Sequence, residues 1–186
     1  MKRKTNSLHL SRETLRHLDG GELAAVNGAA GDWTTIMAIN GTLTDNNTGL
    51  VWEKKSDDGG LHDKDNYYYW SGNSVQETLW DWIEDVNAQA FGGAQDWRIP
   101  NTRELLSIAV FQGPVPAAFN NNCVPGATVF TGSCTNNIAY WTSTSRISST
   151  IGGASTSAWY ANSGGTVYPD FKSNARPARA VRRGTP

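Results

Sequence analysis

Apolar and polar residues follow each other in short blocks along most of this chain, a pattern typical of short strands joined by turns. The β-rich block 33–39 predicts an opening strand. The block 41–53 predicts a hairpin, because its middle residues, Asp45-Asn-Asn-Thr-Gly49, tolerate turn conformations. Extended segments are also predicted later in the chain, at 96–100, 140–143, 158–161, 166–168 and 178–182.

Two segments have the spacing of helices. Ser74 and Glu77 match a capping box, and the apolar residues after them recur at helical spacing until Gly92-Gly93. Asn101 and Glu104 match a second capping box before a short helix that we expect to reach about residue 109. A hairpin, two helices, a long loop at 112–137 and terminal strands form the order of an α+β fold, not of repeated βαβ units.

The first thirty residues follow a different pattern. They lack the continuous apolar core of a Sec signal peptide. Instead, apolar residues lie on one side of a broken amphipathic helix, and small residues follow at 28–31. These apolar residues are Leu15, Leu18, Leu23 and Val26. The pattern favours a helical leader outside the folded domain, and the alternative is an amphipathic helix that docks on the domain.

This segment resembles double-glycine leader peptides, including those of class I lanthipeptides. The matching residues are Leu8, Leu10, Glu13, Thr14, Leu15, Leu18, Glu22, Leu23, Val26, Gly28 and Ala29, with Ala29 in place of the second glycine. The resemblance implies that a peptidase-containing ABC transporter binds Leu15, Leu18, Leu23 and Val26 and cleaves after Ala29. It divides the chain into a leader at 1–29 and a domain at 30–186, and it implies a secreted or cell-surface protein.

Composition and charge exclude some classes of partner. The 186 residues suit one domain plus an appendage, and eight Trp, six Tyr and five Phe supply apolar area for a core. The formal net charge is −1, which indicates no general attraction to nucleic acid. The sequence has no apolar run long enough for a membrane span.

Two cysteines, Cys123 and Cys134, bracket a loop that contains Pro and Gly. In an exported protein such a pair most simply forms a disulfide that closes the loop. In a cytosolic protein the same residues would be two free thiols.

Catalytic chemistry is scarce in the sequence. Of the three His residues, His9 and His17 lie in the leader segment and only His62 follows it. No serine-hydrolase, phosphate-loop or paired-cysteine metal motif is present. We therefore expect a non-enzymatic protein.

An acidic stretch around His62 holds Asp57, Asp58, Asp63 and Asp65. Such oxygen-rich loops can bind Ca²⁺, but the spacing matches no EF-hand. We interpret it as a solvated loop and expect no cofactor, with Ca²⁺ as the alternative.

The domain resembles the DUF1566 family, also called the Lcl C-terminal domain family. Five blocks in order carry the resemblance, namely 44–52, 93–105, 140–144, 158–160 and 176–182. It implies a C-type-lectin-like mixed domain with a loop-rich ligand face. Some members are adhesins for sulfated polysaccharides and some are trimers, so a homo-oligomer is compatible with the resemblance. Within these blocks we expect Trp52, Trp97, Trp141 and Trp159 in the core.

Arginines of the same blocks are interpreted as structural. Arg98, with Glu104, and also Arg176 and Arg179, are expected to be buried and to tie strands and helix together by hydrogen bonds. The alternative is that they bind sulfate or phosphate.

Small, polar and aromatic residues gather around the late strands, and these types are common on adaptable recognition surfaces. The predicted ligand face comprises Ser143, Ser145, Arg146, Ser148, Trp159, Tyr160, Asn162, Tyr168, Asp170, Lys172 and Asn174. Similar segments occur in the variable proteins of diversity-generating retroelements. The leading hypothesis is a secreted recognition or adhesion protein for a glycan or protein. The alternatives are a retroelement-diversified binding protein, a modified-peptide (lanthipeptide-like) precursor, or a lectin-fold enzyme.

Overall fold

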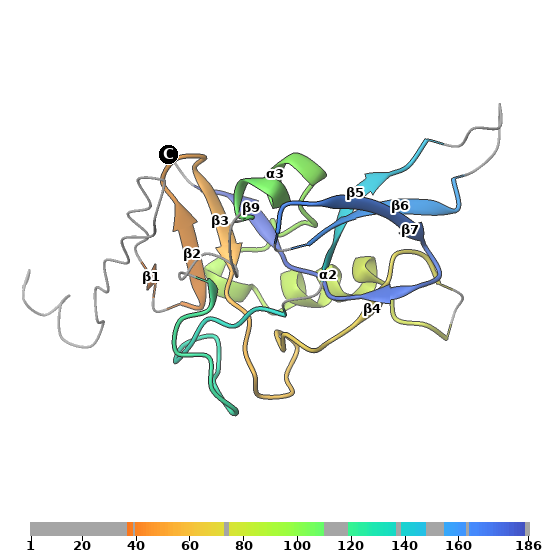
Figure 1. Cartoon of the computed structure of the whole chain (residues 1–186). Coiled ribbons are helices and arrows are strands. Elements are labelled where there is room, and N and C mark those ends of the chain that lie inside the picture. Colours follow the sequence, from red (N-terminus) through yellow and green to blue (C-terminus); the bar gives the residue numbers. More distant parts are fainter. Residues whose placement is uncertain are drawn as a thin grey trace, which may run out of the picture.

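The structure of the chain is a computed structural model that describes residues 37–38, 40–72, 75–109, 119–136, 139–147, 155–162 and 164–184. These residues form three small antiparallel sheets with helices between them (Figure 1). The predicted α+β class is therefore confirmed. The leader segment lies outside the described residues.

The first sheet pairs the beginning of the domain with its end. It comprises β1 (Met37–Ala38), β2 (Thr42–Asp45), β3 (Leu50–Glu53) and β9 (Val181–Arg183), in the order β1-β2-β3-β9. The predicted hairpin is present, and its turn is held by the Asp45 carboxylate, which accepts hydrogen bonds from the Asn47 amide and the Thr48 hydroxyl. Pairing of β3 with β9 closes the domain.

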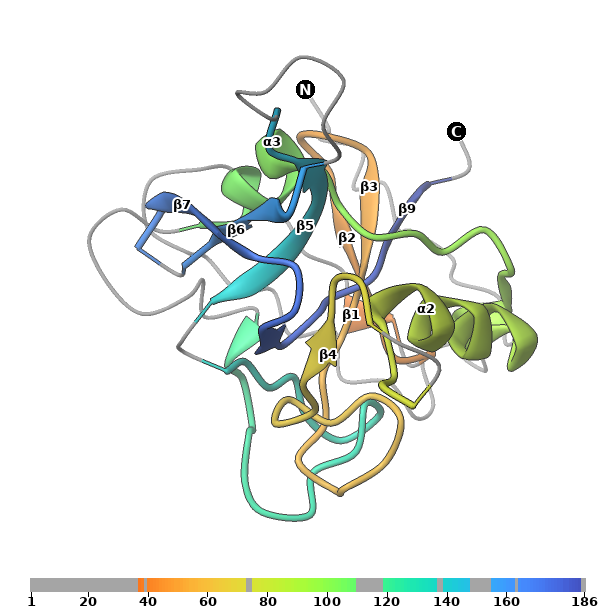
Figure 2. The same cartoon turned by 90° about the vertical axis from the view of Figure 1, so that its right-hand side faces the viewer.

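The two other sheets lie at the opposite side of the domain from β1 (Figure 1), on the side that faces the viewer in Figure 2. One pairs β4 (Tyr68–Tyr69) with β8 (Ala175–Arg176), and the other has the order β5-β6-β7, from β5 (Tyr140–Ser145), β6 (Ser157–Ala161) and β7 (Val167–Phe171). Pro169 lies opposite Trp159 on the edge strand β7. Because proline has no N–H to donate, it blunts this edge against pairing with another chain.

Helix α2 (Leu79–Ala88) begins one turn later than the sequence predicted. Its capping box is formed by Thr78 and Asp81, while Glu77 lies before the helix and Ser74 lies outside the described residues. A helix that began at either capping box would turn the same apolar residues toward the core. The spacing of apolar residues therefore could not show which box begins the helix. Tertiary contacts determine where the helix begins. The Glu77 carbonyl accepts a hydrogen bond from the Tyr69 amide, and Thr78 forms an isolated β-bridge with Tyr69.

The second predicted capping box, Asn101 and Glu104, is confirmed at the start of α3 (Thr102–Ser107). Between the helices lies the 3-10 turn η1 (Phe91–Gly93), which packs against the start of β2 at Gly92. Gly92 has a φ of 61°, and a Cβ atom there would lie 2.6 Å from Thr42 Cγ2, so glycine is required. In the described part of the chain, no helix is long and apolar enough to cross a membrane.

Two apolar clusters form the core. One surrounds α2 and contains Trp82, Trp97 and Trp141, and the other joins the first sheet to α3 and contains Trp52. The predictions for Trp52, Trp97 and Trp141 are confirmed, since each is at most 3% exposed. Trp159 departs from its prediction because it is only half-buried on β6.

The predicted disulfide between Cys123 and Cys134 is present. Its loop is anchored on both sides, because the Cys134 amide donates to the Lys55 carbonyl while Ala127 and Gly126 exchange backbone hydrogen bonds with Asp57. The loop also buries Val129 in the cluster around α2. The disulfide thus fixes a loop that contacts the acidic stretch.

Replacing Cys123 with serine should lower the free energy of unfolding by about 3 kcal/mol, because the unfolded chain regains the freedom of the open loop. Urea denaturation under non-reducing conditions measures this loss. Adding a reductant should destabilise the natural protein to a similar extent and leave the Cys123→Ser variant unchanged. Equal stability of the two proteins without reductant would contradict the prediction.

Candidate functional site

Strands β5, β6 and β7 distribute the predicted ligand residues over both faces of their sheet. Tyr160 and Tyr168 are register partners on one face, together with Asp170. Trp159 points to the opposite face, as side chains alternate along a strand. The sequence could not show this division, so the structure brings together only part of the predicted set.

The face that carries Tyr160 is organised by Arg176 of β8. The Arg176 guanidinium lies 3.7 Å from the centroid of the Tyr160 ring and donates two hydrogen bonds to Oδ2 of Asp170. The rings of Tyr160 and Tyr168 have centroids 5.9 Å apart. Tyr168 remains 49% exposed, so an aromatic ring with a rigid support faces solvent.

Asp170 holds this arrangement in place rather than offering free oxygen atoms. Its Oδ1 accepts hydrogen bonds from the Phe171 amide and from the Asn174 side chain, and its Oδ2 accepts both from Arg176. Burial works to raise the pKa of Asp170, but the hydrogen bond from Arg176 prevails and lowers it below its usual value. Asp170 is therefore a charged support at neutral pH.

Lys172 extends the same face toward β4. Its ammonium lies 3.9 Å from the centroid of the Trp70 ring, and burial lowers the pKa of Lys172. In the described residues no carboxylate is within ion-pair distance of it. The backbone locks this contact, because the Lys172 carbonyl accepts hydrogen bonds from the amides of Trp70 and Ser71.

Trp80 of α2 completes the surface. Its ring meets Trp70 edge-on, with centroids 5.1 Å apart, and its indole N–H donates to the Trp70 carbonyl. Sequence reasoning missed Trp70, Trp80 and Arg176 as members of this face. The aromatic run 67–70 was the one sequence feature that could have indicated this surface. Because it lies about a hundred residues before β7, the sequence did not reveal that Trp70 contacts Lys172.

We call this set the β7–β8 surface. It comprises Trp70, Trp80, Tyr160, Tyr168, Asp170, Lys172, Asn174 and Arg176.

The remaining predicted ligand residues lie apart from this surface. Arg146 is exposed at the end of β5, and Ser143 and Ser145 precede it there. Asn162 is engaged in the β6–β7 turn, where its side chain accepts a hydrogen bond from the Thr166 amide. Ser148 lies outside the described residues, as do the leader positions Leu15, Leu18, Leu23, Val26, Gly28 and Ala29.

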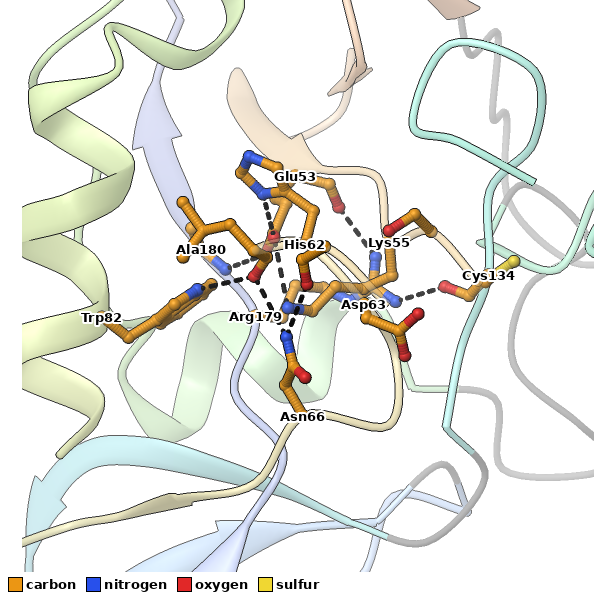
Figure 3. Close-up of polar contacts among 12 residues, drawn as sticks. Glu53, Lys55, His62, Asp63, Asn66, Trp82, Cys134, Arg179 and Ala180 are labelled. Carbon is orange, nitrogen blue, oxygen red and sulfur yellow. Dashed lines mark hydrogen bonds and ion pairs between the residues drawn. The ribbon is translucent and has the colours of Figure 1, made fainter. Parts of the chain in front are cut away.

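A second group of contacts is a buried cluster of charged side chains around Glu53 (Figure 3). The Glu53 carboxylate is fully buried, and its Oε1 lies 2.7 Å from His62 Nδ1 and 3.2 Å from Lys55 Nζ. Its Oε2 accepts a hydrogen bond from the Ala180 amide. Burial alone would raise the pKa of Glu53, but the charge of Lys55 and the His62 contact lower it below its ordinary value.

Arg179, which is 1% exposed, joins this cluster to the disulfide loop. Its guanidinium donates to the carbonyl oxygens of Glu53 and Cys134 and to the Thr135 hydroxyl. The structural role predicted for Arg179 is confirmed. The predicted pairing of Arg98 with Glu104 is also present, as a bidentate pair, although the Arg98 side chain is 41% exposed.

The acidic stretch forms a turn whose oxygens already have partners. Asp63 accepts from the amides of Gly59 and Asp65, and Asp58 accepts from Ser56 and Gly60. Carboxylate oxygens of Asp57, Asp63 and Asp65 come within 4.8 Å of one another, but the Lys64 ammonium pairs with Asp57 and Asp65. A protein cation thus lies where the acidic charges converge.

The family model of the Lcl C-terminal domain matches residues 41–182, which include both described helices and every strand of the three sheets except β1 and the last residue of β9. The chain belongs to the Lcl C-terminal domain family. The comparison with curated proteins found no match. The match begins within the β1–β2 turn and ends in β9, so the Lcl C-terminal domain coincides with the unit that the first sheet closes.

Replacing Glu53 with glutamine should destabilise this Lcl C-terminal domain by about 3–5 kcal/mol, because Lys55 would lose its buried counter-charge. Chemical denaturation at pH 7 measures the loss. Glu84→Gln is the matched control, since Glu84 is exposed on α2, and it should change stability little.

The same carboxylate predicts a pH dependence. Since the pKa of Glu53 is lower in the folded state, its stabilisation is complete above its ordinary pKa of 4.5 and is lost as the pH falls through the folded value. Acid titrations of stability should therefore be steeper for the natural protein than for Glu53→Gln. Parallel curves for the two proteins below pH 4.5 would contradict this assignment.

Proposed function

We propose that this protein is exported and acts by binding a glycan or a protein ligand, without catalysing a reaction. The observation that carries the proposal is the β7–β8 surface. There the half-exposed ring of Tyr168 lies next to Tyr160, Arg176 stacks on Tyr160, and Lys172 lies over Trp70. Aromatic faces stack on sugar rings and pack against protein side chains equally well. Cations beside them supply hydrogen-bond donors.

The rigidity of this surface favours binding. Arg176 stacks on Tyr160 and bonds to Asp170, and the Asp170 carboxylate fixes Asn174 in turn. A ligand would therefore immobilise few side chains, which reduces the entropic cost of association. The Tyr168 hydroxyl and the Asn174 side-chain carbonyl would orient a ligand by hydrogen bonds.

Export is proposed to proceed through the leader, with cleavage after Ala29 by a peptidase-containing ABC transporter. The disulfide between Cys123 and Cys134 supports this route, because such bonds persist in oxidising compartments. The non-enzymatic part of the proposal is supported by His62, the one histidine after the leader. Its Nδ1 atom is hydrogen-bonded to the buried Glu53 carboxylate, and the centroids of the His62 and Phe91 rings lie 4.0 Å apart.

Replacing Tyr168 with alanine should weaken binding to a ligand found on glycan arrays or by pull-down about tenfold or more, because the exposed ring is removed. Phe130→Ala is the matched control, since Phe130 is 63% exposed on the disulfide loop, and it should bind normally. Titration of both variants by calorimetry measures the effect. Equal losses in the two variants, or no ligand across broad panels, would contradict the proposal.

The intact mass of the exported product should equal residues 30–186 minus the two hydrogens lost in one disulfide. Mass spectrometry reports the cleavage site and any modification together. Loss of one or more water molecules would instead favour the modified-peptide precursor, in which Ser and Thr are dehydrated. A product that keeps residues 1–29 would contradict the leader assignment.

A further inference from the structure

The outer face of α2 is strongly acidic and carries an exposed tryptophan. The buried residues Leu79, Trp82, Ile83 and Val86 face the core, which leaves Trp80, Asp81, Glu84 and Asp85 toward solvent. Glu77 lies just before the helix. No Lys or Arg occurs between Lys64 and Arg98 in the sequence. We call Glu77, Trp80, Asp81, Glu84 and Asp85 the acidic face of α2.

Asp81 caps the start of α2 by accepting hydrogen bonds from Thr78, but no cation of the described fold offsets the charge of these carboxylates. Among the described residues, no basic side chain forms an ion pair with any of the four carboxylates. The last turn of α2 has no basic residue, although the helix dipole favours positive charge there. Burial raises the pKa of Glu77, and the charges of Asp85 and Asp81 raise it further, which reflects this repulsion.

Trp80 adds a feature that favours a cationic partner. It is 37% exposed, and its indole N–H is held by the Trp70 carbonyl, so its ring has a fixed orientation. Lys and Arg side chains bind the faces of such rings and pair with neighbouring carboxylates. The acidic face therefore suits a segment with several basic residues.

The chain itself supplies such a segment. Residues 1–17 contain Lys2, Arg3, Lys4, Arg12 and Arg16 and one acidic residue, Glu13. The residues from 30 onward carry the opposite balance, with 11 basic residues (16 minus 5) and 14 acidic ones (17 minus 3). Charge complementarity thus singles out the amino-terminal segment as an occupant.

The fold also brings the start of the domain to α2. The Asn40 side chain donates a hydrogen bond to the Gly92 carbonyl in η1, directly after the C-terminal end of α2. The start of the domain therefore lies beside η1, which follows the C-terminal end of α2. A random-coil tether of 20 residues, the number between Arg16 and Met37, spans roughly 25 Å, and α2 is about 15 Å long.

We propose that, in the uncleaved chain, the basic segment 1–17 docks on the acidic face of α2. Each exposed ion pair is weak, but a tether of this length holds the segment at about millimolar effective concentration. Several weak pairs and one contact with Trp80 then suffice for intramolecular binding. Removal of residues 1–29 exposes the acidic face, so the uncleaved and mature proteins present different surfaces. The docking does not depend on the proposed function.

Zero-length carbodiimide cross-linking of the full chain tests this docking, because it joins an amine to a carboxylate in direct contact. We expect intramolecular links from Lys2 and Lys4 to Glu77, Asp81, Glu84 or Asp85. Reversing Arg3, Arg12 and Arg16 to glutamate keeps both lysines and should reduce these links about tenfold, since three attractive pairs become repulsive. Adding Glu84→Lys and Asp85→Lys should restore links to Glu77 and Asp81.

The matched control reverses three exposed arginines elsewhere, Arg103→Glu, Arg146→Glu and Arg183→Glu, with the same change of net charge. Its links to α2 should equal those of the natural chain. Circular dichroism verifies that all variants are folded. Three results would overturn the proposal: no links to α2, links that survive the reversal, or links mainly between molecules. None of these outcomes bears on export or on ligand binding.

Discussion

The buried carboxylate of Glu53 is the interaction on which the rest of the domain depends. It ends β3, caps the Ala180 amide next to β9, and lies against Lys55 and His62. Arg179 extends the same contacts to Cys134 in the disulfide loop. Three segments far apart in sequence, around residues 53–62, 134–135 and 179–180, therefore meet in one buried cluster. Burying these groups costs hydration energy, and only the complete set of partners offsets it.

This constraint also positions the candidate ligand surface. Arg179 and Arg176 lie three residues apart on the same returning segment, so fixing the first limits where the second lies. Arg176 then stacks on Tyr160 and binds Asp170, and β8 pairs with β4 next to Trp70. The charged groups around Glu53 are buried in the core. The β7–β8 surface presents aromatic rings and Lys172, which lies over Trp70.

Charge is distributed unevenly over this Lcl C-terminal domain. Basic residues are absent from a long stretch that includes α2, whereas four of the seven arginines after residue 29 lie between residues 176 and 183. On the β7–β8 surface Arg176 is paired with Asp170, and Lys172 lies over the Trp70 ring. The carboxylates of the acidic face of α2 have no ion-pair partner within the described fold. The β7–β8 surface is therefore supported by its own contacts, whereas the acidic face of α2 suits a cationic segment.

Local chemistry in the sequence determined the hairpin at Asp45–Gly49, the capping box at Asn101, the disulfide and the burial of three tryptophans. Each depends on neighbouring residues or on strong apolar character. The tertiary structure decided where α2 begins, because pairing of Tyr69 with Glu77 and Thr78 selected one of two equivalent caps. It also decided which face Trp159 takes and which residues surround Tyr168. Those contacts join β4, α2 and β8, and spacing along one chain contains no information about which distant segments share a surface.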